Sequence, residues 1–425
     1  MSKRVAVIGT GYVGLTTGAC LAHLGHRVIC ADVDPAKIAS LESGVVPIVE
    51  RGLPELVNEG RTNGRLSFTA DSASAVRTSD IVFLCVPTPQ GEDGSADLSY
   101  VQTAAQQISA HLPFEAIVVN KSTVPVGSTK VVERALGRPD VRVVSNPEFL
   151  REGSAVDDFL HPDRVVVGGD DQAACMQVAD LYTGLSTRVI ITDPASAETI
   201  KYAANAFLAT KLSFINAIAA ICEGVGADIN DVVVGMGSDH RIGQDFLRPG
   251  PGWGGSCFPK DSRALIKIAE DAGYRFSLLE GVVEVNNDQL DRVARKILEG
   301  AAKQGATVAI WGLTFKANTD DLRDSPSLAV IERLLASGVR VQAFDPTCRE
   351  QRSVLAADIV LTASPVDACH GADVLAVLTE WDEFKWVDPT LVAQAMTGRH
   401  VVDARNLLDR SDWKRAGFTY EGIGR

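Results

Sequence analysis

The chain has 425 residues and a formal net charge of −13, and 46% of its residues are hydrophobic while 22% are charged. A single hydrophobic core rarely serves a chain of this length, so about two or three domains are expected. The acidic charge argues against a sequence-independent nucleic-acid-binding protein, which would need a basic face to neutralise phosphates. An anionic small ligand is compatible with this charge if lysine and arginine side chains gather at its site.

The N-terminal residues, the longest apolar segment and the cysteines all favour a cytoplasmic protein. Residues 1–4 run directly into an apolar stretch, so no signal peptide is expected. The longest apolar segment, about 203–222, includes Asn205, Lys211 and Asn216, so we expect no membrane span. The eight cysteines form no C-x-x-C pair and no metal-like cluster with histidine, so reduced thiols and no bound metal are expected.

The first half of the chain alternates short β-branched stretches with helical ones. This alternation predicts an α/β fold with a parallel, doubly wound sheet covered by helices on both faces. The predicted strands are Arg4–Ile8, Arg27–Ala31, Ile81–Val86, Ala116–Lys121 and Val141–Ser145.

One long helix is predicted from Ser196 to about Gly226. At 1.5 Å per residue it would span roughly 45 Å. Alanine, leucine and isoleucine occur on several of its faces, so it must be buried as a bridge between domains, as a dimer core, or as both.

The last third of the chain resembles a worn copy of the first. Val308–Gly312 is similar to Val5–Gly9, and Gly338–Pro346 is similar to the segment that starts at Gly25. The copy has Leu313–Lys316 where the first has a glycine-rich turn, so it should bind something other than a dinucleotide. We therefore expect two Rossmann-like domains, at 1–195 and 301–425, joined by a helical dimerisation domain at 196–300.

Gly9, Gly11 and Gly14 form a G-x-G-x-x-G turn that follows a strand and opens a helix, the context that a dinucleotide-binding turn requires. The glycines allow a tight turn, close approach of the pyrophosphate and close packing of helix on strand, and the phosphates lie at the helix N-terminus. Asp32 ends the second strand, where a carboxylate accepts the adenine ribose hydroxyls and repels a 2′-phosphate. The sequence therefore favours NAD over NADP. It also favours a dinucleotide-binding site over the alternative, a glycine-rich turn without a ligand.

Two pairs of polar residues lie where a substrate could bind. The segment Ser145–Gly153 follows a strand, so it lies at the carboxyl edge of the sheet, where doubly wound folds bind ligands. Glu148 and Glu152 would share a face if this segment turns helically. Lys201 and Asn205 are also four residues apart, on the long helix, and the alternative for them is a solvated helix face.

The stretch Gly250–Asp261 is dense in glycine and contains Cys257. Pro259 suits the first turn of a helix over about Lys260–Ala272, which places Cys257 just before a helix N-terminus. Together with Lys260 nearby, that setting stabilises a thiolate and makes a nucleophile, whereas a cysteine is by default a small buried hydrophobe.

An NAD site together with a nucleophilic cysteine favours a four-electron oxidation. A dehydrogenase that stops at the carbonyl needs no covalent catalyst. An enzyme that carries an alcohol to the acid does, because a thiohemiacetal can give up a second hydride and leave a thioester that water hydrolyses.

Over essentially its whole length the chain resembles the nucleotide-sugar 6-dehydrogenases. The matching segments are Gly11–Gly14, Val86–Pro89, Lys121–Pro125, Asn146–Gly153, Asn205–Phe207, Gly254–Asp261, Phe315–Lys316 and Asp324–Pro326. The resemblance is greatest to the branch that acts on UDP-glucose. It implies oxidation of the sugar C6 alcohol to UDP-glucuronate, release of two NADH, and a homodimer through the central helix.

The resemblance also implies roles for individual residues. Cys257 would be the covalent nucleophile, and Lys201 and Asn205 would stabilise the oxyanion of the thiohemiacetal. Acid–base chemistry around an ordered water would fall to three residues, and the sequence does not decide which carboxylate moves which proton: Asp261, Glu148 and Thr123.

Two sets of ligand contacts follow from the same resemblance. Arginine and lysine side chains suit the diphosphate of the sugar nucleotide, and Arg241 would be supplied across the dimer interface. The implied cofactor contacts are Gly9, Gly11, Tyr12, Val13, Gly14, Asp32, Lys37, Thr88, Thr123, Glu152, Lys260 and Arg323. The implied substrate contacts are Glu148, Phe149, Leu150, Arg151, Glu152, Lys201, Asn205, Arg241, Phe246, Leu247, Arg248, Gly250, Gly254, Phe315, Lys316 and Arg405.

Three alternatives stay open. Arg248–Trp253 has two prolines and a tryptophan that could reshape the pocket around the base, so TDP-glucose or another nucleotide sugar is an alternative substrate. A two-electron 3-hydroxyacid dehydrogenase would share the first domain and the Lys201–Asn205 pair but would not need Cys257. A non-catalytic NAD-responsive protein would need neither Cys257 nor Asp261.

Overall fold

The structure is a computed structural model that describes residues 2–91, 94–301, 303, 305–348 and 355–425. The chain forms two compact units, Met1–Ala204 with Arg263–Ala272, and Asn205–Ser262 with Gly273–Arg425. We call them the N-terminal and the C-terminal unit. Helices α9 (Pro194–Val225) and α11 (Phe258–Asp271) each pass from one unit into the other.

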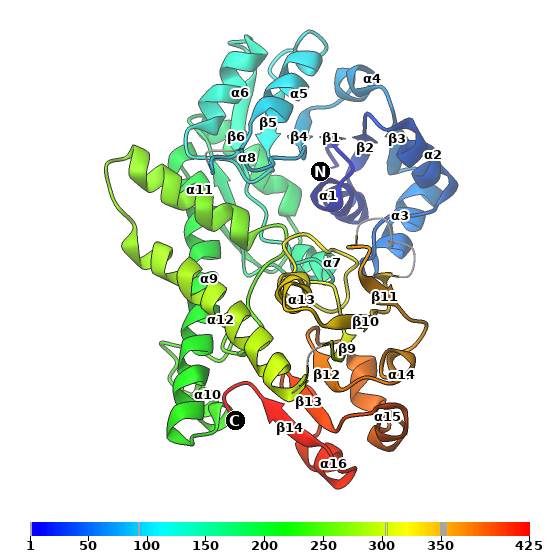
Figure 1. The fold of residues 1–425 in the computed structure, drawn as a ribbon. Helices are drawn as coiled ribbons and strands as arrows, with labels where there is room; N and C mark the ends of the chain where they lie inside the picture. Colours follow the sequence, from blue (N-terminus) through cyan, green and yellow to red (C-terminus); the bar gives the residue numbers. More distant parts are fainter. Residues whose placement is uncertain (1, 92–93, 302, 304, 349–354) are drawn as a thin grey trace. The chain divides into compact units, whose positions relative to one another are not determined.

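The N-terminal unit is built on an eight-stranded sheet in the order β3-β2-β1-β4-β5-β6-β7-β8 (Figure 1). All neighbouring strands are parallel except β6 and β7. The strands are β1 (Arg4–Ile8), β2 (Arg27–Ala31), β3 (Leu66–Thr69), β4 (Ile81–Leu84), β5 (Ile117–Asn120), β6 (Arg142–Ser145), β7 (Arg164–Gly168) and β8 (Arg188–Thr192).

Helices cover both faces of this sheet, which confirms the doubly wound prediction. Alternate residues of β1 enter different cores: Val5 and Val7 lie in one, and Ala6 and Ile8 lie in the other. The first core is covered by α1 (Tyr12–His23), α2 (Pro35–Ser43), α3 (Leu53–Thr62), α7 (Ala155–Leu160), α8 (Gln172–Ala179) and η1 (Asp180–Tyr182). The second is covered by α4 (Ser72–Arg77), α5 (Ser99–Ser109) and α6 (Ser128–Leu136).

The C-terminal unit contains a second sheet, in which every neighbouring pair is parallel and the order is β11-β10-β9-β12-β13-β14. Its strands are β9 (Thr307–Trp311), β10 (Arg340–Phe344), β11 (Ile359–Leu361), β12 (Val374–Val377), β13 (His400–Asp403) and β14 (Thr419–Gly422). One face packs on α9, α10 (Ile229–Gly237), α12 (Ser277–Ala301) and α13 (Pro326–Ala336). The other packs on α14 (Pro365–Ala368), η3 (Asp382–Trp386), α15 (Pro389–Ala395) and α16 (Arg410–Arg415).

The two sheets share a local design at the end of their first strands. In the N-terminal unit, Thr10 donates from its backbone N–H and its hydroxyl to Asp32 Oδ2, at 2.8 and 2.6 Å. In the C-terminal unit, Thr314 donates in the same two ways to Asp345 Oδ2, both at 3.1 Å. Trp381 Nε1 donates to that oxygen as well. The predicted duplication is therefore visible in the side-chain contacts, and in the copy a tryptophan adds a donor to the carboxylate.

The predicted elements are confirmed, and the first two strands match their expected bounds, whereas the ends of the other elements differ. The fourth strand ends at Leu84 and not at Val86, since the segment that follows leads into Pro87, which has no N–H for a ladder. The long helix runs over Pro194–Val225, and the last predicted helix begins at Phe258. Strands β3, β7 and β8 were not predicted. The three-part domain division stays a prediction.

The long helix α9 is the one described helix that is long and apolar enough to cross a membrane by length and composition. Of its most apolar window, 44% is buried inside the structure, and a core helix of a water-soluble protein passes the same test. Its polar residues also have partners inside the protein, as Ser213 does with Val282 O at 2.7 Å.

The turn between β1 and α1 depends on glycine for two separate reasons. A Cβ on Gly14 would lie 1.9 Å from Gly9 O and 3.0 Å from Cys85 Cβ, so helix and strand could not pack as they do. Gly9 has φ +98°, in the left-handed region. A Cβ on Gly11 would meet nothing within 4 Å, so the space beside Gly11 is open.

These contacts predict stability effects of different size for two substitutions of the same kind. Gly14→Ala forces backbone apart and should lower the free energy of unfolding by about 1–3 kcal/mol. Gly11→Ala should change it by less than about 0.5 kcal/mol, as at an uncrowded surface position. Urea unfolding of the whole chain measures both, and equal midpoints for the two variants would contradict the account.

Candidate functional site

The N-terminus of α1 has the features of a phosphate-binding turn. The helix begins at Tyr12 with Gly11 as its N-cap, and no side chain of the described chain caps it. Its first N–H groups are therefore directed at the open space beside Gly11, where the helix dipole favours an anion. The glycine pattern and this geometry fit the pyrophosphate of a dinucleotide.

Asp32 is held at the end of β2 as an ionised carboxylate. It is 9% exposed and accepts from Thr10, from Asp34 N at 3.1 Å and from Lys37 Nζ at 3.2 Å. Burial raises the pKa of Asp32, but these hydrogen bonds outweigh burial and hold the pKa below its usual value. A charged carboxylate at this place suits ribose hydroxyls and repels a further phosphate, so the residues present fit NAD.

Glu148 and Lys201 form a buried ion pair inside the N-terminal unit. Lys201 Nζ on α9 lies 2.8 Å from Glu148 Oε1 in the loop after β6, and both side chains are about 5% exposed or less. Leu150 N donates to Glu148 Oε2 at 2.7 Å. Burial raises the pKa of Glu148, but Lys201, Leu150 N and the charge of Lys121 together hold it below its usual value. The pair brings a fixed carboxylate and a fixed ammonium to the carboxyl edge of the sheet.

Lys121 is a buried cation that the residue-by-residue prediction missed. Its Nζ donates to Asn146 Oδ1 at 3.1 Å and to Tyr182 OH at 3.2 Å, and the Tyr182 hydroxyl donates to the same Asn146 oxygen. Burial lowers the pKa of Lys121 to about 8, although Glu148 opposes this. No local pattern marks it, because the strand before it ends in the polar Asn120 and its partners lie far along the chain.

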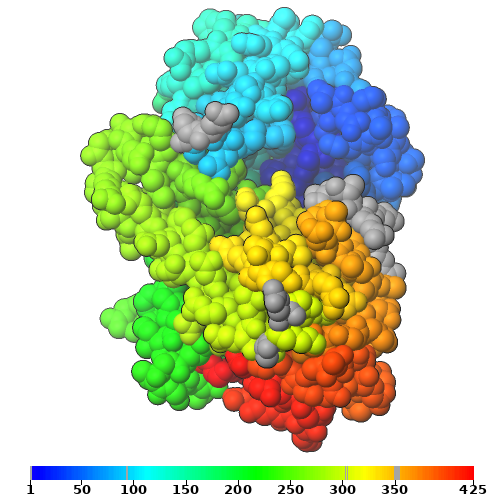
Figure 2. Space-filling view, viewed as in Figure 1, coloured from blue at the N-terminus to red at the C-terminus, as the bar shows by residue number. Residues whose placement is uncertain are grey.

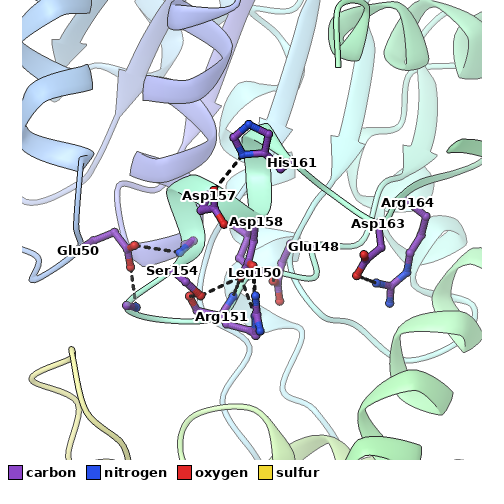
Figure 3. Close-up of polar contacts among 12 residues, drawn as sticks. Glu50, Glu148, Leu150, Arg151, Ser154, Asp157, Asp158, His161, Asp163 and Arg164 are labelled. Atoms are coloured by element: carbon purple, nitrogen blue, oxygen red, sulfur yellow. Dashed lines mark hydrogen bonds and ion pairs between the residues drawn. The ribbon is translucent and has the colours of Figure 1, made fainter. Parts of the chain in front are cut away.

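The rest of the loop after β6 is shaped by its own contacts (Figure 3). Arg151 is paired with Asp158, with Nη2 2.5 Å from Oδ1 and the backbone N–H 2.8 Å from Oδ2. Phe149 lies under the guanidinium of Arg164, 3.7 Å from ring centroid to Cζ. Nearby at the same edge of the sheet, Thr88 Oγ1 donates to Thr123 O at 2.9 Å. Because the Arg151 side chain is already paired, the loop presents its backbone to a ligand.

Cys257 lies immediately before α11, with the residues expected around it. Asp261 N donates to Cys257 O at 2.8 Å, which closes the first turn of the helix. The carboxylate of Asp261 is fully buried and accepts from Asn205 Nδ2 and from Lys260 Nζ, both at 2.7 Å. Ser256 Oγ lies 3.6 Å from Cys257 Sγ. The C-terminal unit therefore brings together a half-buried thiol, an amide, an ammonium and a carboxylate.

The glycine-rich loop before Cys257 is fitted to the second sheet. A Cβ on Gly254 would lie 1.9 Å from Asp324 O, and one on Gly255 would lie 2.7 Å from the ring of Phe315. Arg405 donates to Phe315 O at 3.1 Å and lies 3.0 Å from Glu380 Oε2. The loop, Phe315 and Arg405 thus form one cluster.

The other predicted substrate and cofactor contacts vary in their surroundings. Phe246 has φ +60°, and Leu247 is 2% exposed. Lys316 Nζ lies 5.4 Å from the ring centroid of Phe315. Two arginines are exposed and held by carboxylates two residues earlier in the chain, at 2.6 and 2.7 Å: Arg241 by Asp239 and Arg323 by Asp321.

The predicted catalytic residues therefore fall into two groups. The N-terminal unit holds Thr123, Glu148 and Lys201, and the C-terminal unit holds Asn205, Cys257 and Asp261. Lys201 and Asn205 are one turn apart on α9, which carries one member of each group. Among the described residues, no group of three or more histidine, cysteine or acidic side chains is arranged to hold a metal ion.

Sequence models of one family match three successive parts of the chain. They are the NAD binding domain of the UDP-glucose/GDP-mannose dehydrogenase family at 3–186, its central domain at 195–288 and its UDP binding domain at 309–410.

Individual relatives match over nearly the whole length. The chain is 46% identical to UDP-glucose 6-dehydrogenase TuaD of Bacillus subtilis, over 100% of this chain and 93% of that one. It is 45% identical to UDP-glucose 6-dehydrogenase of Rhizobium meliloti, over 99% of both.

Solved structures agree. A UDP-glucose dehydrogenase from Pyrobaculum islandicum is 36% identical, with a TM-score of 0.92 over 100% of this chain and 98% of that one. A UDP-D-ManNAc dehydrogenase from Pyrococcus horikoshii is 27% identical, with a TM-score of 0.87 over 99% of both chains. The chain is therefore an NAD-dependent oxidoreductase and belongs to the UDP-glucose/GDP-mannose dehydrogenase family.

Proposed function

We propose that this protein oxidises the C6 alcohol of UDP-glucose to the carboxylate of UDP-glucuronate, with two NAD reduced per sugar and Cys257 as covalent catalyst. The observation that carries the proposal is the position of Cys257 at the start of α11, beside the buried Asn205–Asp261–Lys260 cluster. The helix N-terminus and Lys260 favour the thiolate form of a cysteine in this place. Two relatives at 45–46% identity are named UDP-glucose 6-dehydrogenase, and their names support UDP-glucose as the substrate.

Bound NAD supplies the hydride acceptor in both oxidation steps. The chain's own residues handle the protons and the carbon–sulfur bond. A carboxylate takes the proton of the C6 hydroxyl as the first hydride leaves, which produces the aldehyde. The thiolate of Cys257 then adds to the carbonyl carbon, and Lys201 and Asn205 donate hydrogen bonds to the oxyanion. Loss of the second hydride converts this thiohemiacetal into a thioester of Cys257. Attack by water breaks the C–S bond, which releases the acid and restores the thiolate.

Glu148 and Asp261 are the carboxylates available for this proton transfer. Glu148 is kept ionised by Lys201, so it can accept a proton from an alcohol or from the hydrolytic water held with Thr123. Asp261 accepts from Asn205 and Lys260 and lies one helical turn after Cys257. We assign acid–base work to the two together, since both flank residues that would touch the reacting carbon.

The sugar nucleotide would be held by backbone groups and by cations. Arg405 and Lys316 suit the diphosphate, with the backbone of Glu148–Glu152 and the loop from Phe246 to Gly254 around the sugar and base. Trp253, which raised the alternative of TDP-glucose, is 6% exposed and donates from Nε1 to Ser213 Oγ at 2.8 Å. A tryptophan engaged in the core gives no reason to prefer the thymine base.

Turnover stoichiometry tests this function directly. Wild-type protein, NAD and UDP-glucose should give two NADH per sugar consumed, because the covalent aldehyde equivalent is oxidised again before release. A panel of UDP-, TDP- and GDP-sugars, with NADH read by absorbance and the acid by chromatography, ranks the substrates. A ratio of one with UDP-glucose would contradict the four-electron mechanism.

We also propose a homodimer formed through α9. Its described part in the C-terminal unit carries apolar side chains seven residues apart that are 66%, 49% and 58% exposed: Phe207, Phe214 and Ile221. Side chains at this spacing lie on one helical face, and a row of large exposed apolar groups is typical of an interface. In Figure 2 the green atoms of the α9–α10 region lie at the surface of the C-terminal unit. A second copy of the chain would cover this apolar row. It would also allow Arg241 to be supplied across the dimer interface.

Phe214→Glu should convert the dimer to a monomer, since a charge in an apolar interface lacks a partner. Sedimentation velocity should give twice the chain mass for wild type and for the control Phe114→Glu, whose exposed phenylalanine lies in the N-terminal unit. A monomeric wild type, or a dimeric Phe214→Glu variant, contradicts the proposed interface.

We place the protein in the cytoplasm. Seven of its eight cysteines are buried, and burial raises the pKa of Cys20 and Cys85 to about 12, which keeps these thiols protonated and unreactive. This thiol usage supports a reducing compartment.

A further inference from the structure

The loop between α2 and α3 contributes a buried carboxylate that the proposed chemistry does not use. Glu50 is 4% exposed, whereas its neighbours Val49 and Arg51 are exposed, so the glutamate alone turns inward. Its backbone is fixed by the start of α3: Gly52 has φ +81°, and Leu53 N donates to Glu50 O at 3.3 Å. The loop thus holds the glutamate side chain in a defined position.

The carboxylate of Glu50 accepts hydrogen bonds from two distant segments. Tyr12 OH donates to Oε2, and Gly153 N donates to the same oxygen at 2.7 Å. Ala155 N donates to Oε1 at 2.9 Å. Gly153 N also lies 2.7 Å from Tyr12 OH, so phenol, carboxylate and backbone amide form a closed triangle. Figure 3 shows Glu50 directed at the backbone of the segment beside Ser154.

These two segments belong to different ligand sites of the same unit. Tyr12 is the first residue of α1, inside the turn that receives the dinucleotide. Gly153 follows directly on the loop Glu148–Glu152, which the proposed function assigns to the sugar nucleotide. The two oxygens of a carboxylate can accept several hydrogen bonds at once, so one side chain holds donors from both segments. Glu50 therefore ties the position of one site to the position of the other.

We propose that Glu50 is a positioning residue that couples the two ligand sites: a sugar nucleotide that orders the loop at Gly153 tightens the cofactor site at Tyr12, and the cofactor tightens the loop in return. The inference rests on the proposed function for the assignment of the Glu148–Glu152 loop. Coupling of this kind is reciprocal, because it is one free energy shared by two binding equilibria.

The chemistry of the side chains makes the link sensitive to small changes. Tyr12→Phe keeps the ring and removes the hydroxyl that donates to Glu50. Glu50→Gln keeps the shape but replaces one acceptor oxygen with an NH2 group. Because N–H or O–H donors face both oxygens of Glu50, the glutamine must set its NH2 against at least one of them. Each variant should therefore break the link on one side and leave the surrounding fold in place.

Binding of NADH with and without UDP-glucose measures the coupling. These two ligands are both reduced and do not react, so whole wild-type protein can be titrated by NADH fluorescence at equilibrium. Saturating UDP-glucose should tighten NADH binding by about fivefold or more. In Glu50→Gln and in Tyr12→Phe the ratio of the two dissociation constants should fall to near one. The ratio is taken within each variant, so a general loss of NADH affinity cancels, and a merely structural role would leave it unchanged.

Two matched substitutions serve as controls. Glu55→Gln on the exposed side of α3 and Tyr100→Phe on α5 should keep the wild-type ratio, since both side chains are exposed. Thermal unfolding identifies a variant that does not fold, and the other variant then decides. A wild-type ratio in a folded Glu50→Gln or Tyr12→Phe protein would overturn the inference.

Failure of the proposed function is distinguishable from failure of the coupling. Calorimetry of UDP-glucose binding to wild type, without NADH, checks the substrate independently. A chain that does not bind UDP-glucose fails the proposed function. A chain that binds UDP-glucose without any change in NADH affinity overturns the coupling through Glu50 and leaves the proposed function intact.

Discussion

A buried ion pair joins the long helix α9 to the loop that follows β6, and much of the N-terminal unit's site depends on it. Removing an ion from water costs several kcal/mol even after relaxation, and Lys201 and Glu148 offset that cost by facing each other at 2.8 Å. Leu150 N completes the carboxylate's shell. The pair therefore fixes the register of α9 against the sheet. One turn further along the same helix, Asn205 is set towards Asp261.

The same physical constraint explains why charged groups gather at one edge of the sheet. The carboxyl ends of parallel strands all lie at this edge, where helix N-termini and unpaired backbone amides favour anions. Asp32, Lys121 and Glu148 follow three of these strands, and each is held by partners that come from elsewhere in the chain. In the second sheet the corresponding carboxylate, Asp345, is occupied by Thr314 and Trp381. One design thus serves a dinucleotide in the first copy and a different ligand in the second.

The sequence allowed the fold class and the NAD cofactor to be predicted because both depend on local patterns. The turn at Gly9–Gly14 carries its own context, and Cys257 before a helix is visible from Pro259 alone. Glu50 and Lys121 could not be predicted in this way, since their partners lie up to 105 residues away and no spacing rule connects them. Strand β7 was missed because it pairs antiparallel with β6 after the loop that carries Glu148, which breaks the regular alternation. Long-range hydrogen bonds, and not local propensity, complete this site.

Sugar-acid formation by Cys257→Ala shows whether the sugar is carried to the acid while bound to Cys257. Cys348→Ala, at a buried cysteine of the C-terminal unit, is the matched control. Cys257→Ala should bind NADH with nearly wild-type affinity and form no UDP-glucuronate, whereas folded Cys348→Ala should form it. Formation of the acid by Cys257→Ala at a rate close to that of wild type would contradict the thioester mechanism.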